Sequence, residues 1–164
     1  MRQTLTACVL LFTASALHAA TPDLKTIRPP GAQRGAEVEL TLSGARLGDA
    51  QEILYYQTGL TTSKLEKVND NQIKATIKIA PDCPLGLHDL RLRTASGVSE
   101  LRTFSVGALP EIKEVEPNNE FAAPQAIAMN SVVNGVAENE DVDYYAVTAK
   151  KGERITAEVE GIRL

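Results

Sequence analysis

The sequence predicts an all-β protein whose first part is an Ig-like β-sandwich. Apolar and polar residues alternate in several short segments, which is the pattern of antiparallel sheets with one buried and one solvated face. Residues that favour turns separate these segments, and no amphipathic helix of useful length occurs. Short strands with turns at this spacing are typical of a sandwich.

Five alternating or apolar segments are expected as strands. In chain order they are 37–43, 53–56, 72–79, 88–93 and 101–106. The expected turns, rich in Gly, Pro, Asn and Asp, are 29–31, Gly44, 48–49, 69–71, 84–86 and 96–97. In the fourth segment Leu90 and Leu92 share a face with His88, so we expect His88 to be at least partly buried.

The N-terminus predicts an export signal over residues 1–20. Arg2 precedes an apolar core over 5–17, and small residues then favour cleavage after Ala19 or Ala20. The apolar core is shorter than the roughly 20 residues that span a bilayer, and no later stretch approaches that length. We therefore expect an exported protein without a transmembrane anchor, located in the periplasm, at the cell surface or outside the cell.

Composition and motifs argue against two classes of function. With 17 basic and 21 acidic residues the net charge is −4, which disfavours a basic face for nucleic acid. Cys8 lies in the predicted signal, so Cys83 has no disulfide partner, and we expect it to act as a small buried hydrophobe. A turn could bring Cys83 to His88, but no third group orients such a dyad. The sequence predicts that the chain is not an enzyme.

Oxygen-bearing side chains at alternate positions indicate a candidate calcium site. Glu114, Glu116 and Asn118 would point the same way from an extended segment, which the intervening proline favours. Asp141 and Asp143 could complete the site if their loop folds back, because calcium takes six to eight oxygen ligands in irregular geometry. The alternative interpretation is a charged strand edge, which blocks unwanted pairing, followed by an Asn-Asn turn.

The first part of the chain, residues 21–107, resembles an IPT/TIG domain. The resemblance rests on an Ile-x-Pro-x-Gly-type turn and Gly at 27–35, a strand and Gly-Ala-Arg-Leu at 38–47, and a closing hairpin at 84–92, 96–97 and 104–106. It implies an Ig-like sandwich that serves as a spacer or a binding module. Residues 108–113 are expected to form a linker.

From residue 114 onward the chain resembles the bacterial pre-peptidase C-terminal domain. The matching motifs are Glu-x-Glu-Pro-Asn-Asn at 114–119, Ala126, Val-Asn-Gly at 133–135, Asp-x-Asp-Tyr-Tyr at 141–145 and Gly152. The resemblance implies a second, jelly-roll-like β-sandwich, of which residues 114–164 form only part. Its expected strands lie near Val132, Tyr144 and Ile155.

The same resemblance implies a set of calcium ligands. They are Glu114, Glu116, Asn118, Asn119 and one or both of Asp141 and Asp143. Asn119 stands where calcium-binding relatives often carry Asp, so one negative charge is absent. We expect a weak site, with a dissociation constant of roughly 10⁻⁴–10⁻³ M.

Two functions follow as expectations. The first is a non-catalytic secreted or cell-surface module for spacing, adhesion or binding to protein or polysaccharide. The alternative is an accessory segment of a secreted protease, assisting substrate binding or secretion, with the catalytic domain elsewhere. In the Tyr55-Tyr56 and Tyr144-Tyr145 pairs one ring should face inward and one outward, and packing is favoured over a ligand platform for both.

Overall fold

A computed structural model describes residues 21–136, 139–159 and 161, and within these ranges the chain is all-β, without helices. The predicted export signal over 1–20 lies outside the described residues. No helix in the described part of the chain is long and apolar enough to cross a membrane. The all-β prediction is confirmed.

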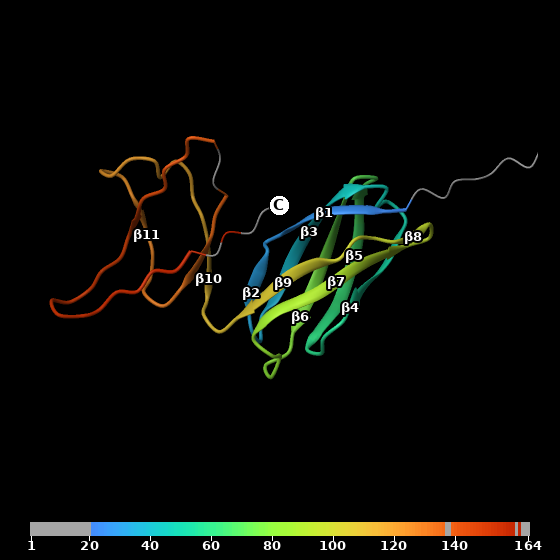
Figure 1. The fold of residues 1–164 in the computed structure, drawn as a ribbon, viewed down its shortest axis with the longest axis horizontal. Coiled ribbons are helices and arrows are strands. Elements are labelled where there is room, and N and C mark those ends of the chain that lie inside the picture. Colours follow the sequence, from blue (N-terminus) through green and yellow to red (C-terminus); the bar gives the residue numbers. More distant parts are fainter. Residues whose placement is uncertain (1–20, 137–138, 160, 162–164) are drawn as a thin grey trace, which may run out of the picture.

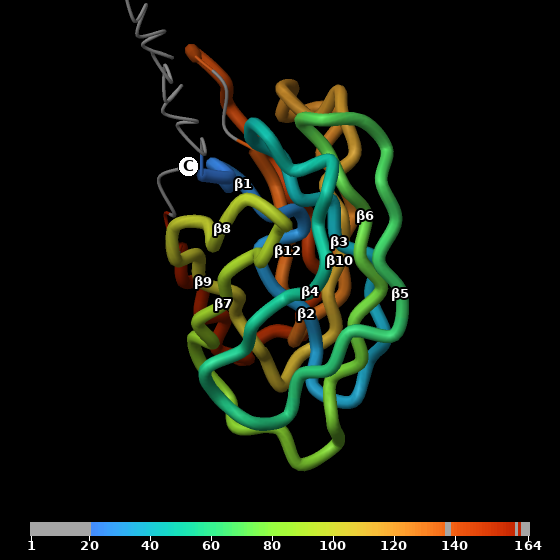
Figure 2. The backbone as a smooth tube through the Cα atoms, turned by 90° about the vertical axis from the view of Figure 1, so that its right-hand side faces the viewer, coloured from blue at the N-terminus to red at the C-terminus, as the bar shows by residue number. Residues whose placement is uncertain are grey.

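Residues from Asp23 to Gly107 form two sheets packed face to face (Figure 1). The first sheet has the order β1 (Asp23–Arg28), β3 (Glu37–Ala45), β6 (Gln72–Ile79) and β5 (Leu60–Asn69), all antiparallel. The second has the order β2 (Gly31–Gln33), β9 (Arg102–Gly107), β7 (Gly86–Thr94) and β4 (Ala50–Tyr55), with β8 (Gly97–Val98) added to β7. Figure 2 shows the layers edge-on, with β7, β8 and β9 on one side and β3, β5 and β6 on the other.

The core lies between these sheets and is built by the alternation in the sequence. All buried apolar side chains of the described residues fall between Leu24 and Val106. The largest of them include Leu40 and Leu42 of β3, Ile73 and Ile77 of β6, Leu90 and Leu92 of β7, and Phe104 of β9. His88 is 2% exposed on the same face, as its register with Leu90 predicts. Each of the five predicted strands is present.

Strand β5 was not predicted, because its sequence does not alternate regularly. The pairing of β5 with β6 shifts register between Thr62 and Lys64 and again between Lys67 and Asn69. Each bulge moves the following side chains to the opposite face, which hides the period of two. Bulges and lysines are typical of an edge strand, which is the position of β5 in its sheet.

Gly44 was expected in a turn, and that expectation is wrong. Gly44 lies within β3 and pairs with Leu24 of β1. A Cβ atom at this position would come 1.9 Å from the carbonyl oxygen of Asp23. Glycine is therefore required here by the close approach of two backbones at the irregularity between β1 and β3.

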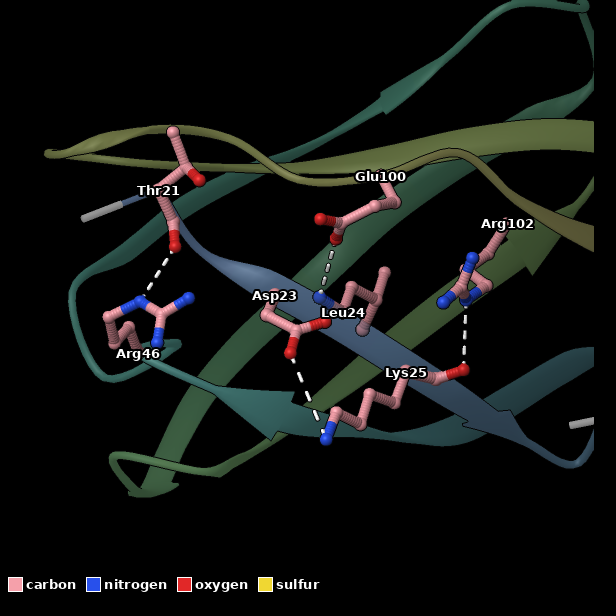
Figure 3. A network of polar contacts seen from close by, with 7 residues as sticks. All are labelled: Thr21, Asp23, Leu24, Lys25, Arg46, Glu100 and Arg102. Atoms are coloured by element: carbon pink, nitrogen blue, oxygen red, sulfur yellow. Dashed lines mark hydrogen bonds and ion pairs between the residues drawn. The ribbon is translucent and has the colours of Figure 1, made fainter.

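The exposed edge of β1 is fastened to the second sheet by side chains (Figure 3). The Leu24 N–H donates to Glu100 Oε2 at 3.1 Å, and Arg102 Nε donates to the Lys25 carbonyl at 2.8 Å. At the start of the strand Arg46 Nε donates to the Thr21 carbonyl at 2.7 Å. These contacts satisfy backbone groups that an edge strand would otherwise offer to another chain.

After the sandwich the chain forms two short parallel pairs. Strand β10 (Glu111–Lys113) pairs with β12 (Val132–Asn134), and β11 (Gln125–Ala126) pairs with β13 (Tyr145–Ala146). Strand β10 occupies half of the expected linker. The strands predicted near Val132 and Tyr144 are present, but the described residues around Ile155 form none, so that prediction is wrong. Residues 154–159 alternate, yet no described strand pairs with them, and alternation alone does not make a strand.

The part of the chain after Val106 has an unusual pattern of burial. Among its described residues only one is buried, the polar Asn118, which is 1% exposed. Large apolar side chains there lie in solvent, with Phe121 81% exposed at the edge of the Tyr144 ring. The described residues of this segment are therefore held together by polar contacts rather than by an apolar core.

Candidate metal centre

Three of the predicted carboxylates converge. Glu114, Glu116 and Asp143 each place one oxygen within 4.8 Å of those of the other two. Two oxygens that bind the same calcium ion at 2.3–2.6 Å lie no further apart than about 5 Å. The spacing of the three carboxylates therefore fits one calcium ion.

Glu114 directly follows β10 and is held by one donor from β13 and one from the residues after β12. The Tyr145 hydroxyl on β13 donates to Glu114 Oε1, and the Val136 N–H, just after β12, donates to Oε2 at 2.8 Å. The hydrogen bond from Tyr145 is the main cause that lowers the pKa of Glu114, and the Val136 bond adds to it. Glu114 is thereby kept ionised, as a metal ligand must be.

Gly135 provides the space that Glu114 occupies. A Cβ atom on Gly135 would come 2.5 Å from Glu114 Oε2 and 2.7 Å from its Cδ. Any side chain here would displace the carboxylate. The Val-Asn-Gly sequence at the end of β12 thus lets Glu114 lie directly against the backbone.

Glu116 and Asn118 converge through a turn. The sequence argument placed residues 114, 116 and 118 on one face of an extended strand, but β10 ends at Lys113 and the segment after it is outside any described strand. The Asn118 N–H donates to Glu116 Oε2 at 2.9 Å, which folds the segment back on itself. The Tyr144 N–H donates to the Asn118 carbonyl at 2.9 Å and brings Asp143 alongside.

The Asn118 side-chain amide faces the carboxylate cluster. In the orientation that satisfies both groups, its N–H₂ group donates to Glu116 Oε2 at 2.9 Å and to Asp143 Oδ1 at 3.2 Å. Turning the amide by half a rotation would instead direct its oxygen toward the cluster. A buried amide can therefore serve the cluster in two ways, as a ligand to a cation or as a hydrogen-bond donor without one.

The electrostatics of the cluster favour a bound cation. Burial raises the pKa of Asp143, and the charges of Glu114, Asp141 and Glu116 raise it further. Burial also raises the pKa of Tyr145, with the Glu114 hydrogen bond and charge adding to it, so its phenol stays neutral and donates. A cation placed among these carboxylates would remove the repulsion that they exert on Asp143.

Asn119 and Asp141 form a separate pair beside the cluster. Asn119 Nδ2 donates to Asp141 Oδ1 at 2.7 Å, so its nitrogen, not its oxygen, faces the aspartate. Asp141 is not among the carboxylates that lie within 4.8 Å of one another. Of the six predicted ligands, the structure brings together Glu114, Glu116, Asn118 and Asp143, while Asn119 and Asp141 join the two segments that carry them.

Two residues of the site were not predicted from the sequence. Tyr145 and Gly135 are both part of the matching motifs, and Tyr145 is also expected as a packing or binding aromatic, but neither is predicted to contact Glu114. Tyr145 acts on a residue 31 positions earlier, and Gly135 acts through its lack of a side chain. A glycine preceding a turn and a tyrosine beside two aspartates were the available signals, and neither identifies its partner.

Cys83 and His88 are close, but their arrangement does not activate the thiol. His88 Nε2 lies 2.7 Å from the Pro84 carbonyl oxygen and 3.7 Å from Cys83 Sγ. Because a carbonyl only accepts, Nε2 carries the proton, and the basic nitrogen is Nδ1, which is buried and has no hydrogen-bond partner among the described residues. Burial also raises the pKa of Cys83. Cys83 is buried, as the sequence predicted.

Comparisons with known proteins place the chain in no established group. No protein family matches the sequence, and no curated protein is similar to it. Among solved structures it is similar to SGBP-B of the mixed-linkage glucan utilization locus of Bacteroides ovatus, determined in complex with a mixed-linkage heptasaccharide. Identity is 15% and the TM-score 0.41, over 66% of this chain and 26% of that chain. The chain thus spans about a quarter of that protein's length.

Proposed function

We propose that this chain is a non-catalytic, exported β-sandwich module whose second segment binds calcium and which presents a surface for binding protein or polysaccharide. Glu114, Glu116 and Asp143 would hold the ion through carboxylate oxygens, and Asn118 through its amide oxygen. The observation that carries the proposal is the convergence of these three carboxylates on the side-chain amide of Asn118, the one buried residue among those described after Val106.

The donor set suits calcium better than other common ions. All of its ligand atoms are oxygens, and they come from a turn and a loop rather than from a rigid frame. Calcium accepts such irregular oxygen sites, whereas zinc prefers nitrogen and sulfur and magnesium requires near-octahedral geometry. Calcium at a site of this kind binds in the weak range of roughly 10⁻⁴–10⁻³ M, which external calcium can occupy.

Calcium would supply to the second segment what an apolar core supplies to the sandwich. Each of the two short parallel pairs contributes a ligand. Glu114 follows β10 of the first pair, and Asp143 precedes β13 of the second. Joining them closes the segment around one ion. A sandwich followed by such a segment suits spacing and presentation, and the Cys83–His88 geometry supports a non-catalytic role. The accessory role beside a secreted protease stays a prediction.

Thermal unfolding with calcium and with chelator tests this proposal. An ion that binds only the folded state adds about 1.4 kcal/mol when its free concentration is tenfold above the dissociation constant. We expect calcium to raise the melting temperature of the wild-type chain, and the Glu116→Gln variant to lose this rise. Glu120→Gln is the matched control, because Glu120 lies exposed in the same segment outside the cluster. An equal rise in both variants would contradict the assignment.

A further inference from the structure

We propose that the outward face of the sheet β2-β9-β7-β4 binds a neutral polysaccharide through Tyr56. This inference rests on the proposed function and deepens it, because it assigns the ligand class and the surface. In Figure 1 this face is turned toward the viewer, and no other part of the described chain crosses in front of β7.

The Tyr56 ring stands on the solvent side of the sheet. Tyr55 is partly buried and its hydroxyl shares a hydrogen bond with the Thr62 hydroxyl at 2.8 Å, whereas Tyr56, the next residue, is 59% exposed. Its backbone is fixed, because the Tyr56 N–H donates to the Asp89 carbonyl at 3.1 Å. Tyrosine on a fixed backbone has few rotamers to lose on binding, so little entropy opposes the contact.

A carboxylate is held in place beside this ring. The Asp89 N–H donates to Gln57 Oε1 at 2.7 Å, and Gln57 Nε2 donates to Asp89 Oδ2 at 3.3 Å. A carboxylate has about four acceptor positions, so this contact leaves room for hydroxyl donors. On the far side of Asp89 its register partner in β9 is Thr103, which adds an exposed hydroxyl to the same row.

This combination matches the chemistry of a sugar ring. One face of a pyranose carries C–H groups that pack on an aromatic ring, and its edge carries hydroxyls that donate to a carboxylate. A negative charge next to the ring disfavours anionic polysaccharides. The neighbouring guanidinium groups are directed away from the ring, since Arg91 donates to the Ser99 carbonyl at 2.7 Å and Arg93 forms an ion pair with Glu52 at 2.6 Å. The surface formed by Tyr56, Asp89 and Thr103 therefore favours a neutral glycan.

The same face is poorly suited to a protein partner. Its exposed apolar side chains lie beside polar ones, with Tyr56 next to Asp89 and Leu87 opposite Ser105 in the register. The buried centre of a protein interface is depleted of charged residues, whereas Asp89 lies in the middle of this face. The series of Tyr56 ring, Asp89 carboxylate and Thr103 hydroxyl across neighbouring strands instead fits an extended chain of sugars.

Native affinity electrophoresis of the exported chain tests this inference. The gels contain barley mixed-linkage β-glucan, xyloglucan or dextran as neutral probes, and polygalacturonate as the anionic probe. We expect at least one neutral probe to retard the wild-type chain and polygalacturonate not to. Tyr56→Ala should weaken the retarding affinity roughly tenfold, while Tyr56→Phe keeps it. Val68→Ala, which truncates an exposed apolar side chain on β5 in the opposite sheet, is the matched control.

The outcomes separate this inference from the calcium proposal. Retardation lost in Tyr56→Ala and kept in Glu116→Gln supports the polysaccharide surface even if calcium has no effect on unfolding. The inference is overturned if no neutral probe retards the wild-type chain. It is also overturned if wild type and Tyr56→Ala are retarded equally. Light scattering that shows a dimer abolished by Tyr56→Ala would also overturn it, in favour of a second copy on this face.

Discussion

The Tyr145 hydroxyl donates a hydrogen bond to the Glu114 carboxylate and so joins the end of β10 to β13, 31 residues later in the chain. This contact positions the first carboxylate of the cluster and keeps it ionised. Residues that orient a metal ligand in this way typically change metal affinity by a factor of 10 to 100 when they are altered.

Replacing Tyr145 by Phe should therefore weaken calcium binding by about tenfold or more. The change removes the donor to Glu114 and leaves the ring in place. Calcium titration followed by tyrosine fluorescence or by melting temperature measures the effect. Tyr144→Phe is the matched control, because the Tyr144 ring packs against Phe121. If both variants bind calcium as the wild type does, Tyr145 does not position Glu114.

Replacing Gly135 by Ala should also weaken calcium binding, through displacement of the Glu114 carboxylate. The new methyl group would fall 2.5 Å from Glu114 Oε2, and the side chain rather than the backbone would have to move. Gly161→Ala is the control, because a Cβ atom there meets nothing within 4 Å. A wild-type calcium affinity in Gly135→Ala would show that the carboxylate can bind calcium from another position.

Replacing Asn118 by Asp should have opposite effects with and without calcium. The aspartate keeps an oxygen toward the cluster but cannot donate to Glu116 or Asp143, so the calcium-free protein loses stability. With calcium the additional charge should raise affinity, by roughly tenfold, because ligand charge tunes such sites. Asn139→Asp adds the same charge at an exposed position of the same segment and serves as the comparison. Denaturant unfolding measures the change in the free energy of unfolding with calcium and with chelator. A loss of stability in both conditions would contradict the role of Asn118.

Two glutamates should give opposite pH dependences of stability. The pKa of Glu114 is lowered in the folded state, so its contribution is present above its unfolded pKa and is lost as the pH falls through the folded pKa. Burial raises the pKa of Glu111, which the Asn134 hydrogen bond only partly offsets, so its contribution improves as the pH falls.

Denaturant unfolding in chelator between about pH 3 and pH 7 measures this difference. Glu114→Gln should be least stable relative to wild type at the upper end, and the difference should shrink in acid. Glu111→Gln should be at least as stable as wild type at the upper end and lose that advantage in acid. Parallel profiles for the two variants would contradict the assigned environments.

The Cys83 thiol should be inert in the folded protein. It is buried, burial raises its pKa, and the charge of Asp82 raises it further, so little thiolate forms at neutral pH. An aromatic disulfide reagent should label Cys83 in urea but only at the rate of unfolding in buffer. Rapid labelling of the folded chain would reopen the possibility of a Cys83–His88 dyad.

The sandwich could largely be predicted from the sequence because its sheets each bury one face. Strand β6 occupies the segment predicted for it, since Ile73, Ala75, Ile77 and Ile79 alternate without interruption. Strand β5 could not be predicted in this way, because two bulges break its alternation. Gly44 shows the related difficulty that glycine marks either a turn or a close approach of two backbones, and only the neighbouring strand decides which.

The metal cluster could be predicted in part. Glu114, Glu116 and Asn118 were identified by spacing and resemblance, but the geometry that unites them is a turn rather than a strand. Asp141 is hydrogen-bonded to Asn119, whereas Asp143 joins the carboxylate cluster. The sequence does not reveal which of the two aspartates takes which position, because Asn119 lies 22 residues before Asp141. Long-range positioning by Tyr145 and Gly135 requires the fold, because neither residue lies near Glu114 in the sequence.

A calcium titration of the ¹⁵N-labelled chain from Thr21 onward, followed by NMR, tests the central claim most directly. The account predicts that the amide signals of Asn118, Val136 and Tyr144 shift along one saturable curve, with a midpoint of roughly 10⁻⁴–10⁻³ M, while signals from the sandwich core stay in place. The same titration of Glu116→Gln should leave those signals unmoved. Signals that stay in place in the wild type up to about 10 mM calcium would contradict the account.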